Sequence, residues 1–128
     1  MMKEVIASDQ APQAIGPYSQ AVRLGSWVFL SGQIGLDPAT GELVAGGVGP
    51  ETVRVLENLR AVLAGAGDSF DQVVRTTIYL TDLADFSRVN ELYGAVFHAP
   101  FPARATVGVA ALPRGAHVEI DAIARLEE

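Results

Sequence analysis

The chain contains no cysteine and only two histidines, His98 and His117, among its 128 residues. Without a thiol it can form neither a disulfide, nor a thiolate nucleophile, nor a thiolate metal site. The two histidines lie nineteen residues apart, and neither has a cluster of carboxylates at ligand spacing around it. We therefore expect no metal site.

Positive charge and long apolar runs are also scarce. Nine Lys and Arg residues stand against fifteen Asp and Glu, which gives a net charge of −6, and they are scattered along the chain. Because such a chain offers no basic patch to a phosphate backbone, nucleic-acid binding is disfavoured. Apolar runs such as Trp27–Leu30 are too short to span a bilayer, and Met1–Gln10 lacks the regions of a signal peptide. We expect a cytoplasmic protein without a membrane partner.

No linker, repeat or low-complexity segment divides the chain. Thirteen glycines and seven prolines are spread along it, and 49% of the residues are hydrophobic. We therefore expect residues 1–128 to form one domain, which would bury roughly two thirds of the surface of its unfolded chain.

The first half of the chain predicts a hairpin and a turn. Val22–Leu30 and the following Ser31–Leu36 are typical of two short strands joined through Gly25–Ser26, because apolar and β-branched residues flank a glycine-containing break. Asp37–Gly41 combines proline and glycine in the pattern of a tight turn.

Two segments have the spacing of amphipathic helices. We expect one over Glu51–Ala64, ended by Gly65 and Gly67, and another over Asp85–Phe97, with Asp85 as a possible N-cap. The apolar positions that recur on one side are Val55, Leu56, Leu59, Val62 and Leu63 in the first segment and Phe86, Val89, Tyr93 and Phe97 in the second.

Three further strands are expected, at Val73–Leu80 and as two antiparallel strands within Phe101–Glu128. In the last two, aliphatic residues alternate with other residues, and successive side chains of a strand point to opposite faces. This alternation predicts that Arg104 and Glu119 lie together on the face turned away from the aliphatic one.

Two one-sided helices and a set of strands predict an α+β sandwich of two layers, with both helices over one face of a mixed sheet. The other face then needs a polar surface or a partner. If that face is open to water, Arg104, Thr106 and Glu119 are ordinary solvated groups. If another subunit covers it, a guanidinium and a carboxylate form a site for a carboxylate-bearing ligand and a water.

Three blocks resemble the RidA/YjgF family of reactive intermediate deaminases: AIGPYSQAV at 14–22, SGQIGLDPATG at 31–41 and PARATVGVAALPRGAHVEI at 102–120. The resemblance implies a chorismate-mutase-like subunit with a six-stranded sheet, a homotrimer, and ligand sites in the clefts between subunits. It also implies cofactor-free hydrolysis of 2-imino acids or their enamine tautomers, such as 2-iminobutanoate and 2-iminopropanoate, to 2-keto acids and ammonia.

The same resemblance assigns roles to single residues. Arg104 would bind the substrate carboxylate, and Glu119 would hold or activate the water. The residues that would line the same cleft are Tyr18, Ser31, Gly32 and Asn90. Each of these four also has a purely structural interpretation, as an interface aromatic, a strand-end turn or an exposed helix position.

The chain departs from the family pattern at two places. Thr106 stands where many members have cysteine, so a thiol has no role there, although a hydroxyl can still form a hydrogen bond. The loop at His98–Pro100 looks shorter than usual, and because it precedes Arg104, we expect it to affect the preferred size of substrate.

Two other functions remain open. A trimer that only binds small carboxylates or keto acids would also need Arg104, but it would gain nothing from a second negative charge at Glu119. The endoribonuclease activity sometimes attached to this family fits the acidic charge poorly.

Overall fold

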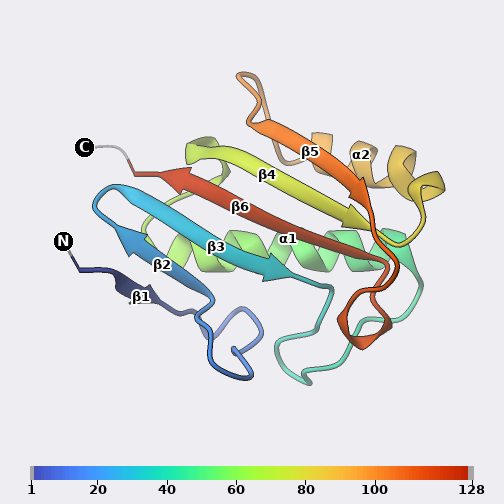
Figure 1. Ribbon diagram of the computed structural model, residues 1–128, viewed down its shortest axis with the longest axis horizontal. Helices are drawn as coiled ribbons and strands as arrows, with labels where there is room; N and C mark the ends of the chain where they lie inside the picture. The colour runs from blue at the N-terminus through green and yellow to red at the C-terminus, as the bar shows by residue number, and fades with distance from the viewer. Residues whose placement is uncertain (1, 127–128) are drawn as a thin grey trace.

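A computed structural model describes residues 2–126, which form one six-stranded sheet in the order β1-β2-β3-β6-β4-β5 (Figure 1). The strands are β1 (Glu4–Ile6), β2 (Ala21–Leu24), β3 (Trp27–Gln33), β4 (Val73–Leu80), β5 (Ala103–Gly108) and β6 (Val118–Arg125). Neighbouring strands are antiparallel except β4 and β5, which are parallel. The predicted mixed sheet is confirmed. The three-residue β1 was not expected, because it is too short to give a periodic pattern.

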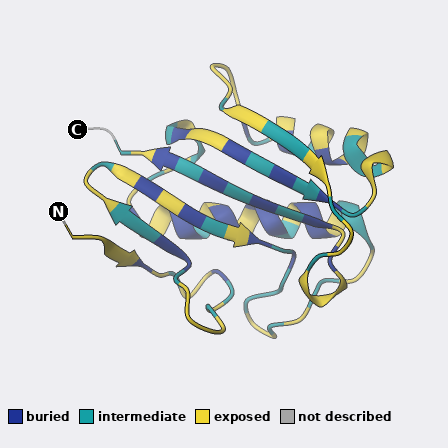
Figure 2. Cartoon of the chain, in the orientation of Figure 1, coloured by how far each residue is buried: buried dark blue, intermediate teal, exposed yellow. Residues whose placement is uncertain are grey.

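Two helices, α1 (Val48–Gly65) and α2 (Phe86–Gly94), lie behind the sheet on one face (Figure 1). The core lies between these helices and the sheet, and buried positions alternate along the central strands (Figure 2). The sheet residues in this core include Val28, Leu30, Ile78, Leu80, Val118 and Ile120, each at most 5% exposed. The predicted arrangement of two helices on one face is confirmed. Among residues 2–126, the structure contains no helix long and apolar enough to cross a membrane.

The predicted limits of the helices are only partly right. Helix α1 begins at Val48, three residues before the predicted start, but its predicted end at Gly65 and Gly67 is confirmed. Gly67, with φ of 77°, follows the last turn, where Asp68 N–H donates to the Leu63 carbonyl at 2.9 Å. A left-handed residue just beyond the last turn is a common helix ending. Helix α2 ends at Gly94 rather than Phe97, although Phe97 remains buried.

Asp85 does not cap α2 with its side chain, so that part of the prediction is wrong. The chain enters α2 through a 3₁₀ turn, η2 (Leu83–Asp85), and the capping carboxylate belongs to Asp82, which accepts from Ala84 N–H at 2.9 Å. The apolar spacing identified the helix, but the extra turn before it moved the cap three positions towards the N-terminus.

The two C-terminal strands are not paired, because β4 lies between β5 and β6. In the ladder, Arg104 stands opposite Thr76, which is buried on the helix side, whereas Glu119 stands opposite Tyr79 on the other face. Arg104 and Glu119 therefore lie on opposite faces of the sheet, and the prediction of a shared face is wrong. The physical reason is that β5 is an edge strand, on which aliphatic side chains do not mark the buried side.

A buried carboxylate joins the start of α1 to the start of β6. Glu51 is 1% exposed and accepts hydrogen bonds from His117, at the backbone N–H (2.7 Å) and at the ring Nδ1. A charged group this deeply buried is tolerated because its oxygens are paired. This contact anchors the segment that leads directly into Glu119.

We expect Glu51→Ala to lower the free energy of unfolding by about 2 to 3 kcal/mol, since two hydrogen bonds to a charged group are lost. Glu57→Ala on the same helix is the matched control. Glu57 forms only an exposed ion pair with Arg60 at 3.9 Å, so its loss should cost less than about 1 kcal/mol. Chemical denaturation measures both, and equal losses would contradict the anchoring role.

Candidate functional site

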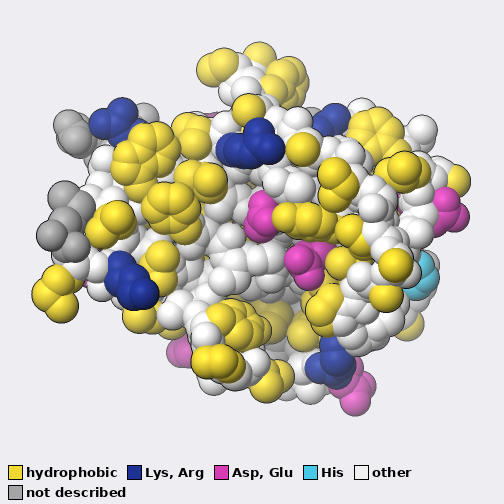
Figure 3. Space-filling model, viewed as in Figure 1, with side chains coloured by type: hydrophobic (Ala, Val, Ile, Leu, Met, Phe, Trp, Pro, Cys, Tyr) yellow, Lys and Arg dark blue, Asp and Glu magenta, His cyan; other side chains and the backbone are white. Residues whose placement is uncertain are grey.

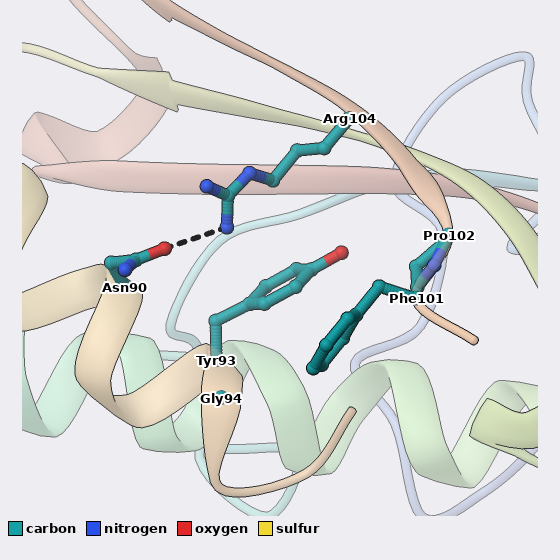
Figure 4. Close-up of a pocket in the computed structure, with 6 residues that line it drawn as sticks. All are labelled: Asn90, Tyr93, Gly94, Phe101, Pro102 and Arg104. Carbon is teal, nitrogen blue, oxygen red and sulfur yellow. Dashed lines mark hydrogen bonds between the residues drawn. The ribbon is translucent and has the colours of Figure 1, made fainter. Parts of the chain in front are cut away.

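A pocket of about 480 Å³ opens between α2 and the start of β5. Its lining residues are Asn90, Tyr93, Gly94, Phe101, Pro102 and Arg104 (Figure 4). Helix α2 supplies the first three, and the loop into β5 supplies the aromatic and proline side chains. Only Asn90 and Arg104 of this group were predicted. The aromatic Tyr93 was assigned to the core stripe of its helix, so spacing alone did not identify it as pocket lining.

Arg104 points from β5 towards α2 and is held there by three neighbours (Figure 4). Its Nη1 donates to Asn90 Oδ1 at 2.8 Å, and the guanidinium carbon lies 4.9 Å from the centroid of the Tyr93 ring and 5.4 Å from that of Phe86. Aromatic faces attract a guanidinium. The bond to Asn90 uses one of its five N–H donors, so the planar fork can still grip a carboxylate.

Tyr93, whose ring contacts the Arg104 guanidinium, is itself held in place. Its side chain is buried, and its hydroxyl forms a hydrogen bond with Thr76 Oγ1 at 2.7 Å. Burial raises the pKa of the Tyr93 phenol, against smaller lowering effects from the Thr76 hydrogen bond and the Arg104 charge. The ring is therefore neutral at physiological pH and presents an uncharged π face to the guanidinium.

Glu119 lies on the opposite face of the sheet, half-buried against Gly32. A Cβ atom at Gly32 would stand 2.5 Å from Glu119 Oε2 and 2.8 Å from its Cδ, so this carboxylate position requires glycine. The ladder between β3 and β6 is irregular between Leu30 and Gln33, the stretch that contains Gly32. Burial, and secondarily the negative charge of Asp121, raise the pKa of Glu119.

Two residues beside Glu119 were not predicted as part of a site. Tyr79 stands opposite Glu119 in the ladder, and its hydroxyl donates to Asp121 Oδ2 at 2.9 Å. Asp121 lies two positions after Glu119 on β6 and therefore points to the same face of the sheet, so alternation along this strand could have identified it. Tyr79 comes from a strand forty residues earlier, and only the register of β4 against β6 brings it here.

The remaining predicted residues lie elsewhere. The Ser31 hydroxyl donates to the Ser19 carbonyl at 2.6 Å, and Tyr18, 53% exposed, accepts from Ile15 N–H at 3.3 Å on the loop before β2. Thr106 lies two positions beyond Arg104 on β5 and shares its face. In a single chain, the predicted residues therefore divide between the two faces of the sheet. Asn90 and Thr106 lie with Arg104 on the helix side, whereas Gly32, next to Ser31 in β3, lies against Glu119 on the other face.

The face of the sheet that carries Glu119 is strongly apolar. Leu24, Trp27, Phe29 and Val107 point to this side and are 39–42% exposed. Figure 3 shows this face, with carboxylates among apolar side chains. We call it the open face. Exposed large apolar side chains gathered on one face are typical of an interaction site.

The family model described as Endoribonuclease L-PSP matches residues 8–126. Over 126 residues the chain is 64% identical to the protein DfrA of Myxococcus xanthus, covering 97% of this chain and 96% of the relative. It is 52% identical over 124 residues to a 2-iminobutanoate/2-iminopropanoate deaminase of Mus musculus, covering 97% and 92%.

The fold is similar to that of solved structures over nearly the whole chain. The crystal structure of E. coli TdcF with bound serine matches with a TM-score of 0.92 and 43% sequence identity, and the match covers 97% of this chain and 99% of that one. A relative of this fold thus binds a small amino acid.

We expect Glu119→Gln to stabilise the protein at neutral pH. Because the folded-state pKa of Glu119 is raised, the folded state holds the proton more tightly, and stability falls as pH rises from the ordinary glutamate pKa through the raised one. Glutamine removes that loss, by less than about 1 kcal/mol because the half-exposed charge is screened.

Urea unfolding at neutral pH and at a pH below the ordinary glutamate pKa measures this difference, which should vanish in acid. Glu42→Gln, on an exposed loop, removes the same charge as a control. A Glu119→Gln protein that is less stable than the parent at neutral pH would refute the argument.

Proposed function

The chain belongs to the RidA/YjgF family, and from that premise we propose that it is a hydrolytic deaminase that converts reactive 2-imino acids or their enamine tautomers to 2-keto acids and ammonia. The proposed substrates are 2-iminobutanoate and 2-iminopropanoate, as the name of the mouse relative suggests. The single observation that supports this function most directly is the guanidinium of Arg104 held at the edge of an aromatic-lined pocket.

Arg104 is the proposed carboxylate-binding residue. A 2-imino acid carries a carboxylate next to its C=N carbon, and a planar guanidinium grips a carboxylate with two parallel charge-assisted bonds. That grip fixes the direction of the imine carbon. Tyr93 and Phe101 would contact the short alkyl group of the substrate. Since Phe101 belongs to the loop that follows His98–Pro100, the length of this loop would set the substrate size.

Glu119 is the proposed general base. As a water oxygen bonds to the imine carbon, Glu119 takes one proton from the water and passes it to the imine nitrogen, which leaves a carbinolamine with one hydroxyl and one amino group. Glu119 then takes the hydroxyl proton and gives it to the amino nitrogen as the C–N bond breaks, so ammonia leaves and the 2-keto acid remains. The raised pKa of Glu119 strengthens it as a base.

Because Arg104 and Glu119 face opposite sides of the sheet, we place each site between two copies of the chain, with Arg104 from one and Glu119 from its neighbour. The apolar open face supports an assembly of this kind. The homotrimer and the chorismate-mutase-like subunit implied by the family are part of the proposal. Tyr18, Ser31, Gly32, Asn90 and Thr106 are its proposed cleft residues. The cytoplasmic location and cofactor independence also stay predictions.

A trimer that only binds small carboxylates is the second candidate, and the serine bound to TdcF favours it. The half-buried Glu119 argues for turnover instead, since a second negative charge weakens the binding of an anion. An endoribonuclease, the activity named in the family model, would need a basic surface that a chain of net charge −6 does not provide.

The direct test couples the protein to a pyridoxal-phosphate-dependent dehydratase acting on serine or threonine, which releases the imino acid. We expect 2-keto acid to appear faster when this protein is added. An unchanged rate, together with tight binding of 2-oxobutanoate, would establish the binding trimer instead.

Arg104→Lys should lower kcat/KM on the order of 10²-fold although the charge is kept, because an ammonium cannot reproduce the bidentate geometry that orients the substrate. Arg88→Lys, on an exposed face of α2, is the control and should leave the rate unchanged. If Arg104→Lys is as active as the parent protein, the guanidinium has no role in the mechanism.

Mixed assemblies test whether the site is shared between copies. Glu119→Gln alone should lose on the order of 10² or more in rate while it still binds 2-oxobutanoate. When Arg104→Lys and Glu119→Gln chains are co-expressed, a cyclic mixed trimer has roughly one site in three with both original residues, so activity should return in part.

Two differently tagged chains allow mixed trimers to be isolated, and sedimentation confirms their mass. If isolated mixed trimers are as inactive as the single variants, Arg104 and Glu119 act from the same chain. A stable monomer of the parent at micromolar concentration would refute the shared site altogether.

A further inference from the structure

Tyr79 and Asp121 form a hydrogen-bonded pair beside Glu119 that the scheme above does not use. The ladder between β4 and β6 sets Tyr79 opposite Glu119 and Thr77 opposite Asp121. The phenol of Tyr79 therefore reaches diagonally across the open face to donate to Asp121 Oδ2 at 2.9 Å. This bond fixes a second carboxylate two residues from Glu119 on the same side of the strand.

We propose that Tyr79 and Asp121 are positioning residues that act through Glu119: the tyrosine holds the aspartate in place, and the aspartate keeps a negative charge beside the base and so favours proton uptake from the attacking water. The inference rests on the proposed function, in which Glu119 is that base. It adds two residues that touch neither the substrate nor the reacting atoms.

Glu119 lies close to this charge. Its carboxylate lies against the Gly32 backbone, and Asp121 follows two positions later on the same face of β6. Asp121 and Tyr79 are also half-buried, so water screens their interaction with Glu119 less than on an open surface. Without the tyrosine bond, Asp121 could rotate into solvent and the effect would weaken.

The titration behaviour agrees with this arrangement. The pKa of Glu119 is raised by burial first and by the Asp121 charge second. The pKa of Tyr79 is raised chiefly by its hydrogen bond to Asp121, with smaller effects of burial and of the Asp121 charge. Tyr79 is therefore a neutral phenol at physiological pH and remains the donor in this bond.

Other charged groups near this face belong to different contacts. His117, two residues before Glu119, binds Glu51. Arg75 of β4 stands opposite Ile123, four residues from Glu119, and lines a hollow of the open face together with Asp121. The residues of β3 that approach Glu119 are Ser31 and Gly32, and neither carries a charge. Within its own chain, Asp121 is thus the charge to which the pKa of Glu119 responds.

The pH dependence of kcat/KM tests the role of the pair. In Asp121→Asn we expect the acid limb to move to lower pH and the plateau to fall by roughly two- to tenfold, because the base becomes weaker. In Tyr79→Phe the acid limb should also move to lower pH and the plateau should also fall, but both changes should be smaller than in Asp121→Asn. Asp71→Asn removes an equal charge from an exposed residue before β4, at the end of this strand away from Tyr79, and should leave the profile unchanged.

A second measurement does not depend on activity. The carboxyl carbon of Glu119 can be titrated by NMR, with its signal assigned through Glu119→Gln. The inference predicts a lower midpoint in Asp121→Asn than in the parent. An unchanged midpoint, or an acid limb that does not move in an otherwise active variant, would overturn it.

The two proposals fail separately. A parent protein without imine hydrolysis refutes the deaminase but leaves the NMR shift of Glu119 to be observed. Conversely, a normal deaminase in which Asp121→Asn shifts neither the midpoint nor the acid limb refutes the role of the pair alone.

Discussion

Strand β4 relates the faces of the sheet to which Arg104 and Glu119 point. It lies between β5 and β6, parallel to one and antiparallel to the other, so its register relates the two strands that carry charge. Arg104 is paired with Thr76 and therefore points to the helix side. Glu119 is paired with Tyr79 and therefore points to the open face. A shift of β4 by one residue would reverse both assignments, because side chains alternate with period two.

The sequence predicted the positions of the helices and strands better than it predicted which strands are paired. β4 has the predicted bounds, and both helices were found from their apolar spacing, because a one-sided pattern reflects burial against a core. The pairing of the last two strands was wrong, since alternation within a strand does not state which neighbour it has. On the edge strand β5, aliphatic Val107 faces outward and polar Thr106 faces the helix side.

The candidate site shows the same limit. Alternation along the last two strands singled out Arg104 and Glu119, and the family pattern added Asn90 and assigned the roles. The reason for glycine at position 32 appears only when the Glu119 carboxylate is seen against its backbone. Tyr79 could not be predicted at all, because its relation to Glu119 depends on the register between strands far apart in sequence.

Assembly would change the proton affinity of Glu119 as well as bring the residues of the site together. The open face leaves Glu119 half-exposed beside a second carboxylate, an arrangement that does not favour folding of a single chain. A neighbouring copy over this face would remove water from Glu119, and further desolvation raises the pKa of a carboxyl group. It would also bring a guanidinium towards the same space. A nearby positive charge lowers the pKa of a carboxyl group, so assembly would act on the proton affinity of Glu119 in two opposing ways. Activity should therefore depend on assembly through proton affinity as well as through geometry.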